Sequence, residues 1–283
     1  MIALLFVSFV WAFSFGLIKE ELSGVNPELA GLLRLCISLL VFVPFLRIKS
    51  LGPRLCLRLM AVGAVQYGLM YVTYISSFTY LQAHQVAMMT ITTPLYVAII
   101  AGLYQRQLNI RAIVAVIGAI AGALIIVMRS LTPADFGLGM ILLQISNVCF
   151  AWGQVYYRKL AGDNPKIKTR EVFAVIYLGA VITAAAATAS SRGFSGITEL
   201  NLRQWAVIFY LGALASGLCF FLWNWAAVRV RVGTLAAANN LKIPLAITCS
   251  LLFFGETVNI PRLIIGGGII AAVFVWSSKG KRR

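Results

Sequence analysis

The sequence predicts an all-α polytopic membrane protein whose ten transmembrane helices form two inverted five-helix repeats. The composition indicates the class, because 61% of the 283 residues are hydrophobic and only 11% are charged. Ten apolar windows of about 20 residues indicate the helix count, since a helix of that length crosses about 30 Å of hydrocarbon. An echo of the sequence at a constant offset of 150 residues indicates the repeat.

The predicted helices follow one another from the first residues to the C-terminus. Asn26 and Pro27 mark one helix start, as N-cap and first helical residue. The turn that begins at Thr132 and Pro133 opens the second half of the chain. The predicted helix centres are Phe9, Leu39, Gly68, Leu95, Ala119, Ile145, Gly179, Leu214, Ala246 and Ile270.

The echo relates residues 87–109 to residues 237–259. Five helices per copy is an odd number, so the second copy must enter the membrane upside down, with the binding site near the midplane between the copies. We expect the first repeat over residues 1–131 and the second over residues 132–283. The matched pairs are Pro94-Leu95 with Pro244-Leu245, Asn109-Ile110 with Asn259-Ile260, and Gly118 with Gly268.

The positive charges predict the orientation of the chain. If the N-terminus is cytoplasmic, the inside loops and tail hold 17 of the 24 Lys and Arg residues and the outside loops hold five. This bias places both termini in the cytoplasm. It also accounts for the net charge of +16, so we do not expect the protein to bind nucleic acid. We expect a multi-pass protein that is surrounded by the lipid bilayer.

The ninth predicted helix contains the most informative side chain. Lys242 follows Asn239 and Asn240 and precedes Pro244, whose missing N–H and bulky ring are expected to break the helix. An ammonium at that depth costs roughly 2.5 kcal/mol or more unless it faces protein, water or a ligand. One interpretation is a polar cavity in which Lys242 meets an anionic solute. The other is a lysine that snorkels or binds carbonyl groups at the break.

Further polar residues fall within predicted helices. Arg34 has two interpretations: a structural one, in which it snorkels to the outer surface or satisfies carbonyl groups of a neighbouring helix, and a functional one, in which it presents a positive charge to an anion at the outer mouth of the cavity. Tyr67, Tyr71 and Tyr74 follow i, i+4, i+7 spacing, which predicts one shared helix face. The residues we expect to bind solute are Lys242, Asn239, Asn240, Asn224, Tyr71, Tyr74, Thr90, Trp152, Gln144 and Arg34, with Pro94 and Pro244 as kink or gating positions.

Glycine-rich segments in the fifth and tenth helices predict close helix contacts. They are Gly118-x-x-x-Gly122 and Gly266-Gly267-Gly268, and they fit either a contact between the halves or a homodimer. We expect no cofactor and no metal, because the single histidine, His84, has no carboxylates near it in the sequence.

The whole chain resembles the drug/metabolite transporter superfamily, in particular its bacterial EamA type with ten helices. The resemblance is carried by Trp152-Gly153, by the prolines of the fourth and ninth helices, and by Gly255-Glu256. In the first half Gln105-Arg106 replaces the last pair. The resemblance implies a transporter in the bacterial inner membrane that moves small metabolites, often amino acids outward, by alternating access.

The predicted function is therefore outward transport of a small metabolite, an amino acid or a related carboxylate, by alternating access through a central cavity. An enzyme is not expected, because the spans contain no HExxH, GxSxG or paired aspartates. A passive channel and a membrane scaffold without transport activity are the alternatives. A channel would not show a saturating flux, and a scaffold would not need a buried lysine.

Overall fold

The fold is all-α over the residues that the computed structural model describes. These are residues 2–47, 51–104, 133–230 and 232–255, with short pieces at 106, 114, 117–118, 121, 260–262, 264–266, 268–269 and 272; the side chains of 133–136, 232–241 and 244 are not included. Within this part of the chain no strand occurs. The predicted all-α class is confirmed, and the protein is a polytopic helical membrane protein.

Seven segments of the described residues are long and apolar enough to cross a membrane, and each contains one predicted centre. The ninth centre lies in the 22-residue helix α12. The fifth and tenth centres, the glycine motifs and the homodimer contact expected there lie outside or only partly within the described residues. The elements are α1 (Ile2–Glu21), α2 (Pro27–Phe42), η1 (Val43–Phe45), α3 (Pro53–Gly63), η2 (Ala64–Leu69), α4 (Met70–Tyr80), α5 (Ala83–Met89), η3 (Thr90–Thr92), α6 (Thr93–Tyr104), α8 (Pro133–Asp163), α9 (Thr169–Ser190), η4 (Gly193–Glu199), α10 (Leu202–Tyr210), η5 (Leu211–Leu218), α11 (Cys219–Ala227) and α12 (Val232–Phe253).

The start of α2 follows the local chemistry of the sequence. The Asn26 side chain accepts a hydrogen bond from the Leu29 amide at 2.9 Å, and Pro27 occupies the first turn. Proline is suited to this position because its missing N–H has no partner within the helix anyway. The predicted cap is confirmed.

Two membrane-crossing segments each contain a π-helical stretch. In α3–η2–α4 it is η2, and in α10–η5–α11 it is η5. A π-helix bonds to the fifth residue along the chain, so it changes the angular spacing of the side chains that follow it. Tyr67 lies in η2, whereas Tyr71 and Tyr74 lie in α4. Tyr67 and Tyr71 nevertheless pack against the same ring, that of Phe220, with centroid separations of 4.6 and 5.8 Å.

The two proline-containing segments differ. Around Pro94 the α-helix is interrupted by the 3₁₀ turn η3, and α6 begins again at Thr93. Hydroxyl groups bind carbonyls there: Thr90 donates to the Ala87 oxygen at 2.7 Å, and Thr92 to the Met89 oxygen at 3.0 Å. By contrast α12 continues through residue 244, so the predicted break of that helix is wrong. One missing N–H removes one hydrogen bond, and neighbouring groups in a bundle can compensate for it.

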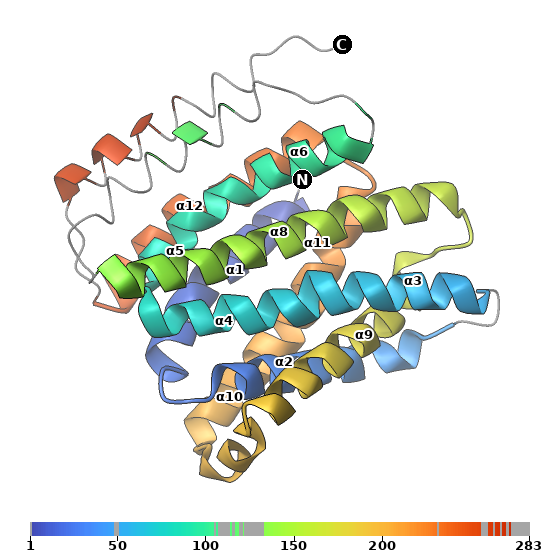
Figure 1. The fold of residues 1–283 in the computed structure, drawn as a ribbon, viewed down its shortest axis with the longest axis horizontal. Coiled ribbons are helices and arrows are strands. Elements are labelled where there is room, and N and C mark those ends of the chain that lie inside the picture. The colour runs from blue at the N-terminus through green and yellow to red at the C-terminus, as the bar shows by residue number, and fades with distance from the viewer. Residues whose placement is uncertain are drawn as a thin grey trace.

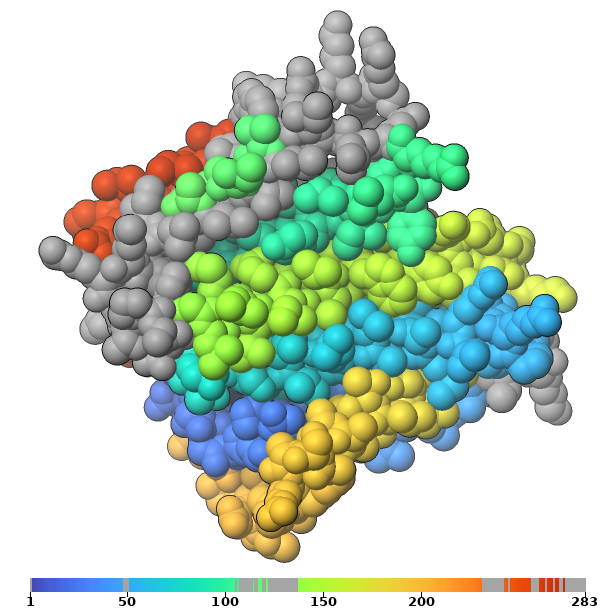
Figure 2. All heavy atoms as spheres, viewed as in Figure 1, coloured from blue at the N-terminus to red at the C-terminus, as the bar shows by residue number. Residues whose placement is uncertain are grey.

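The helices form a bundle in which distant parts of the chain lie side by side (Figure 1). α8 runs beside α3–η2–α4 and α6, while α1 lies along α12 and α2 along α9. Figure 2 shows α6, α8, the α3–η2–α4 segment and α9 as adjacent bands across one face. This packing brings α1, α4, α8, α11 and α12 around one central region.

Candidate functional site

A cavity lies where these helices converge. Its volume, measured as the space open to the centre of a water molecule, is about 70 Å³. Its lining combines an aromatic wall, a set of neutral polar groups and two cationic side chains. The described lining residues are Trp11, Ser14, Phe15 and Ile18 of α1, Arg34 of α2, Met70, Tyr71 and Tyr74 of α4, Thr90, Thr93, Ser146, Asn147 and Phe150, Phe220, and Lys242 of α12.

Lys242 lies in this cavity. Its side chain is 7% exposed, and its ammonium nitrogen is 5.3 Å from the centre of the Trp11 ring. The negative face of an indole ring attracts a cation at such a distance. No acidic side chain of the described residues forms an ion pair with Lys242. The ammonium is therefore placed to meet a negatively charged group that enters the cavity.

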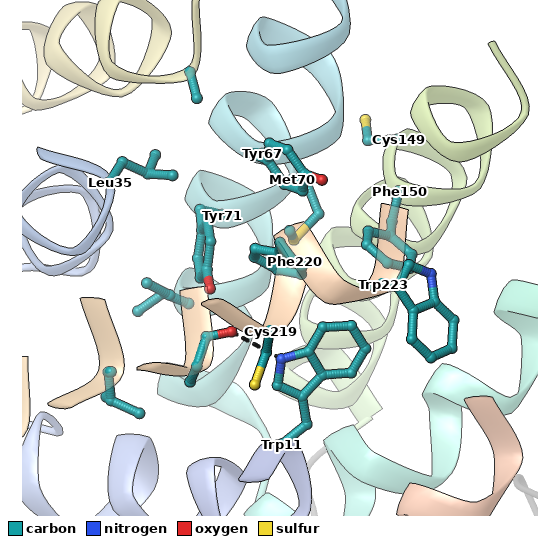
Figure 3. Close-up of a cluster of buried hydrophobic side chains, with 14 of the residues drawn as sticks. Trp11, Leu35, Tyr67, Met70, Tyr71, Cys149, Phe150, Cys219, Phe220 and Trp223 are labelled. Carbon is teal, nitrogen blue, oxygen red and sulfur yellow. Dashed lines mark hydrogen bonds between the residues drawn. The ribbon is translucent and has the colours of Figure 1, made fainter. Parts of the chain in front are cut away.

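Trp11 is held in place by its neighbours (Figure 3). Its indole N–H donates to the Ala215 carbonyl oxygen at 2.9 Å. The ring packs against Phe220 and Trp223, with centroid separations of 5.2 and 5.1 Å, and meets Phe150 edge-on at 6.1 Å. A ring fixed on its N–H and its faces provides a rigid apolar wall for the cavity.

Arg34 is the second cation, and the prediction that it snorkels to the surface is wrong. The side chain is 2% exposed, and its guanidinium lies 4.5 Å from the centre of the Tyr71 ring. It donates to the Tyr71 hydroxyl at 2.8 Å and to the Ser216 hydroxyl at 3.3 Å, but its Nη1 has no hydrogen-bond partner. The guanidinium therefore adds a second buried positive charge to the cavity wall, and such a charge favours an anion there.

Neutral hydrogen-bonding groups complete the lining. Tyr71 also shares a hydrogen bond with Ser216 at 2.8 Å, which fixes its hydroxyl beside Arg34. The Asn147 amide group donates to the Met89 carbonyl at 3.1 Å and to the Thr92 hydroxyl at 3.0 Å. These two bonds connect α8 to the interrupted segment α5–η3. They leave the side-chain oxygen of Asn147 to accept from a solute.

Five of the ten predicted binding residues lie in the lining: Lys242, Arg34, Tyr71, Tyr74 and Thr90. The side chains of Asn239, Asn240 and the kink residue Pro244 lie outside the described part. The other three predicted binding residues, Asn224, Gln144 and Trp152, have different surroundings.

The structure places Asn224, Gln144 and Trp152 outside the cavity lining. Asn224 is fully buried and bonds to Gln66 and to the Tyr67 hydroxyl, so its polar atoms are used within the core. The Gln144 oxygen accepts from Thr92 at 2.8 Å and from Tyr96 at 3.1 Å. Trp152 lies two residues after Phe150 and therefore on the opposite side of the α-helix from the cavity. Its ring stacks on Tyr156.

Several lining residues carried no sequence signal. Phe15, Met70, Phe150 and Phe220 are apolar residues in apolar segments, and composition does not distinguish them from lipid-facing neighbours. Ser216, which positions Arg34 and Tyr71, could have been found. It lies 150 residues after Gln66, so the offset of the repeat brings two polar residues into register there.

Fold and site together define a class: a multi-pass helical membrane protein with a buried, cation-bearing cavity at its centre. The EamA-like transporter family model matches residues 1–128 and 137–278. The chain therefore belongs to the EamA-like transporter family, and it is a membrane transporter. The resemblance read from the sequence is confirmed.

Similar proteins are named for one solute. The chain is 38% identical over 282 residues to a "Probable biotin transporter" of Pseudomonas aeruginosa, covering 99% of this chain and 98% of that protein. It is 35% identical to the "Biotin transporter" of Salmonella typhimurium and 33% identical to that of Escherichia coli K12, each over 96% of this chain and 91% of the relative. A crystal structure that shares 17% identity superposes with a TM-score of 0.69 over 99% of both chains, which shows the fold alone.

Proposed function

We propose that this chain transports biotin, or a closely related carboxylate, through the cavity between α1, α4, α8 and α12. The observation that carries the proposal is the pair of cations, Lys242 and Arg34, in a described lining that contains no acidic side chain. The names of the relatives support the same solute.

The lining suits biotin by its chemistry. Biotin carries one carboxylate, which needs a cation or several donors when it leaves water. Its fused ring and chain are largely apolar and fit a wall made of Trp11, Phe150 and Phe220. Its ureido group both donates and accepts hydrogen bonds, as Asn147 and Tyr74 can.

The relatives give no support to the amino acid expected from the sequence. An amino acid would bring an ammonium group into the cavity. That group would need an anionic or carbonyl partner, and the described lining supplies no carboxylate. Biotin carries no such positive charge, so we propose it in place of an amino acid.

The proposed carrier consists of two inverted repeats, residues 1–131 and 132–283. Support comes from the π-helical stretches η2 and η5, which fall in the third helix of each half. The helix contacts also correspond: α1 lies along α12 as α8 lies along α6, and α2 contacts η5 as α9 contacts η2. A cavity on the axis between such repeats can open to either side by the same movement.

Counterflow of radiolabelled biotin into proteoliposomes tests the proposal. The wild-type protein should exchange biotin in a saturable way, as a carrier does and a channel does not. Lys242→Ala should lower exchange by roughly ten- to a hundredfold, because a charge-assisted contact contributes about 1.5–3 kcal/mol. Lys242→Arg should retain part of the activity. Lys166→Ala, at an exposed lysine outside the cavity, is the matched control.

The neutral methyl ester of biotin separates charge recognition from general damage. In the wild-type protein the ester should compete poorly with biotin. In Lys242→Ala the preference for biotin over its ester should become smaller, because one of the two cationic partners of the carboxylate has gone. Folded, reconstituted wild-type protein that neither binds nor exchanges biotin would overturn the proposal.

A further inference from the structure

A second pocket lies away from the solute cavity, at the ends of three membrane-crossing segments. Its walls come from the last turns of α8, the first turn of α9 and the end of α11, and its volume is about 650 Å³. α8 ends at Asp163, α9 begins at Thr169 and α11 ends at Ala227. Because helix ends mark the depth at which hydrocarbon gives way to headgroups, the pocket lies at headgroup level.

The rim of this pocket is strongly basic. Arg158, Lys168, Arg170 and Arg229 line it, and the described lining contains no acidic residue. Beside the pocket, the Glu171 carboxylate is 3.6 Å from the Lys168 ammonium. Glu171 can offset one of the four charges, so three arginines remain without an acidic partner among the described residues.

Aromatic rings hold two of these arginines at the rim. The Arg229 guanidinium lies 4.3 Å from the centre of the Trp225 ring, and its Nη1 donates to the Trp225 carbonyl oxygen at 2.8 Å. The Arg170 guanidinium lies 5.2 Å from the centre of the Phe45 ring. Both contacts leave N–H groups available, and they reduce the side-chain freedom lost when an anion binds.

The start of α9 adds further donors. Its N-cap residue is Lys168, and no side chain caps the first-turn amides there. The N-terminal end of a helix carries a partial positive charge and unpaired N–H groups, and both favour an anion. Together with the arginines, this helix end makes the rim suited to a phosphate group.

Apart from Thr169, the rest of the lining is apolar. Ala161, Ile167, Phe221 and Val228 line the pocket below the charges, and Trp225 is 39% exposed. A soluble phosphate compound would gain nothing from this wall. A phospholipid would place its phosphate among the arginines and its glycerol and upper acyl chain along the apolar side.

We propose that this pocket binds the headgroup of an anionic phospholipid such as phosphatidylglycerol. The site is separate from the solute cavity, so the inference does not depend on the identity of the solute. The bound lipid bridges α8, α9 and α11, all of which belong to the proposed second repeat.

Native mass spectrometry of delipidated protein in mild detergent tests the proposal. Phosphatidylglycerol and phosphatidylethanolamine with identical chains are titrated separately, so that only the headgroup differs. We expect phosphatidylglycerol to bind at least tenfold more tightly to the wild-type protein. Replacing two basic residues, as in Arg158→Gln with Arg229→Gln, should weaken its binding by about tenfold to thirtyfold and remove most of the preference.

A matched double variant controls for total charge. Arg54→Gln with Arg58→Gln removes two exposed arginines from α3, outside the pocket, and should retain the preference. If the pocket double variant does not fold, the single variants Arg158→Gln and Arg229→Gln should each weaken binding by threefold or more.

Three results would overturn the proposal. The first is equal binding of the two lipids to the wild-type protein. The second is an unchanged preference in the pocket variants. The third is competition by glycerol 3-phosphate at the same concentration as the lipid, which would identify a site for soluble anions instead.

Discussion

The two cations of the solute cavity are held in different ways. Arg34 is fixed by hydrogen bonds to Tyr71 and Ser216 and by the Tyr71 ring. Among the described residues, Lys242 contacts the Trp11 ring. A rigid guanidinium orients a carboxylate, whereas a flexible ammonium can follow it as the cavity changes shape. We therefore expect Arg34 to depend on its neighbours for its position and Lys242 to depend on them less.

Substitution of Tyr71 tests this dependence. Tyr71→Phe retains the ring but removes the hydroxyl that accepts from Arg34 and bonds to Ser216. The loss of a buried hydrogen bond costs about 1 kcal/mol, which corresponds to a roughly fivefold weaker binding of biotin if Arg34 loses its orientation. Isothermal titration or scintillation proximity binding in detergent measures the change.

Tyr157→Phe is the control for Tyr71→Phe. Its hydroxyl donates to Thr169 at 3.0 Å, outside the solute cavity, so its removal should lower the melting temperature without changing biotin affinity. Equal affinity losses in both variants would show that the effect of Tyr71 on binding is general destabilisation.

At the scale of the elements, glycines determine how closely the helices approach. A Cβ atom on Gly63 would collide with the Ile176 carbonyl oxygen, and one on Gly179 would collide with the Met60 carbonyl oxygen. α3 and α9 therefore contact each other through reciprocal glycines. Gly153 similarly leaves room for the Gln66 side chain, which bonds to Asn224. Small residues at such crossings allow backbone contact in a membrane bundle.

Adding one methyl group at the crossing should destabilise the fold. Gly63→Ala or Gly179→Ala forces α3 and α9 apart, because the atom to be displaced is a backbone oxygen. Overpacking of this kind costs about 1–3 kcal/mol, which thermal unfolding in detergent would detect as a fall in melting temperature. Gly162→Ala, in α8 with open space around it, should leave the melting temperature unchanged or raise it. A similar fall in all three variants would contradict a role for close packing.

At the scale of the whole molecule, the charge distribution and the repeat determine how the protein lies in the membrane. The loop between α8 and α9 is rich in basic residues, and the connection between α9 and α10, which contains η4, is not. We propose that the first faces the cytoplasm and the second the outside, with both termini cytoplasmic. This orientation places the proposed lipid pocket at the cytoplasmic surface, where anionic headgroups are attracted to basic residues.

Single cysteines test the orientation. Lys166→Cys and Ser195→Cys, both at exposed positions, are introduced into a cysteine-free background and treated with a membrane-impermeant maleimide. In intact cells Ser195→Cys should react, and Lys166→Cys should react only after the membrane is permeabilised. The reverse pattern would place the basic loop outside and contradict the predicted orientation.

The sequence alone determined the class, the family and the approximate positions of the helices, because hydropathy, charge bias and the repeated proline segment are properties of the chain itself. It also identified Lys242, since a charge in an apolar helix is conspicuous without any structure. Tertiary structure decided which side chains share the cavity. Tyr67 bonded to Asn224 in the core whereas Tyr71 lined the cavity, α12 continued past residue 244, and Arg34 lay buried between Tyr71 and Ser216. Those outcomes depend on helix rotation and on contacts between segments distant in the chain, and local sequence patterns do not contain them.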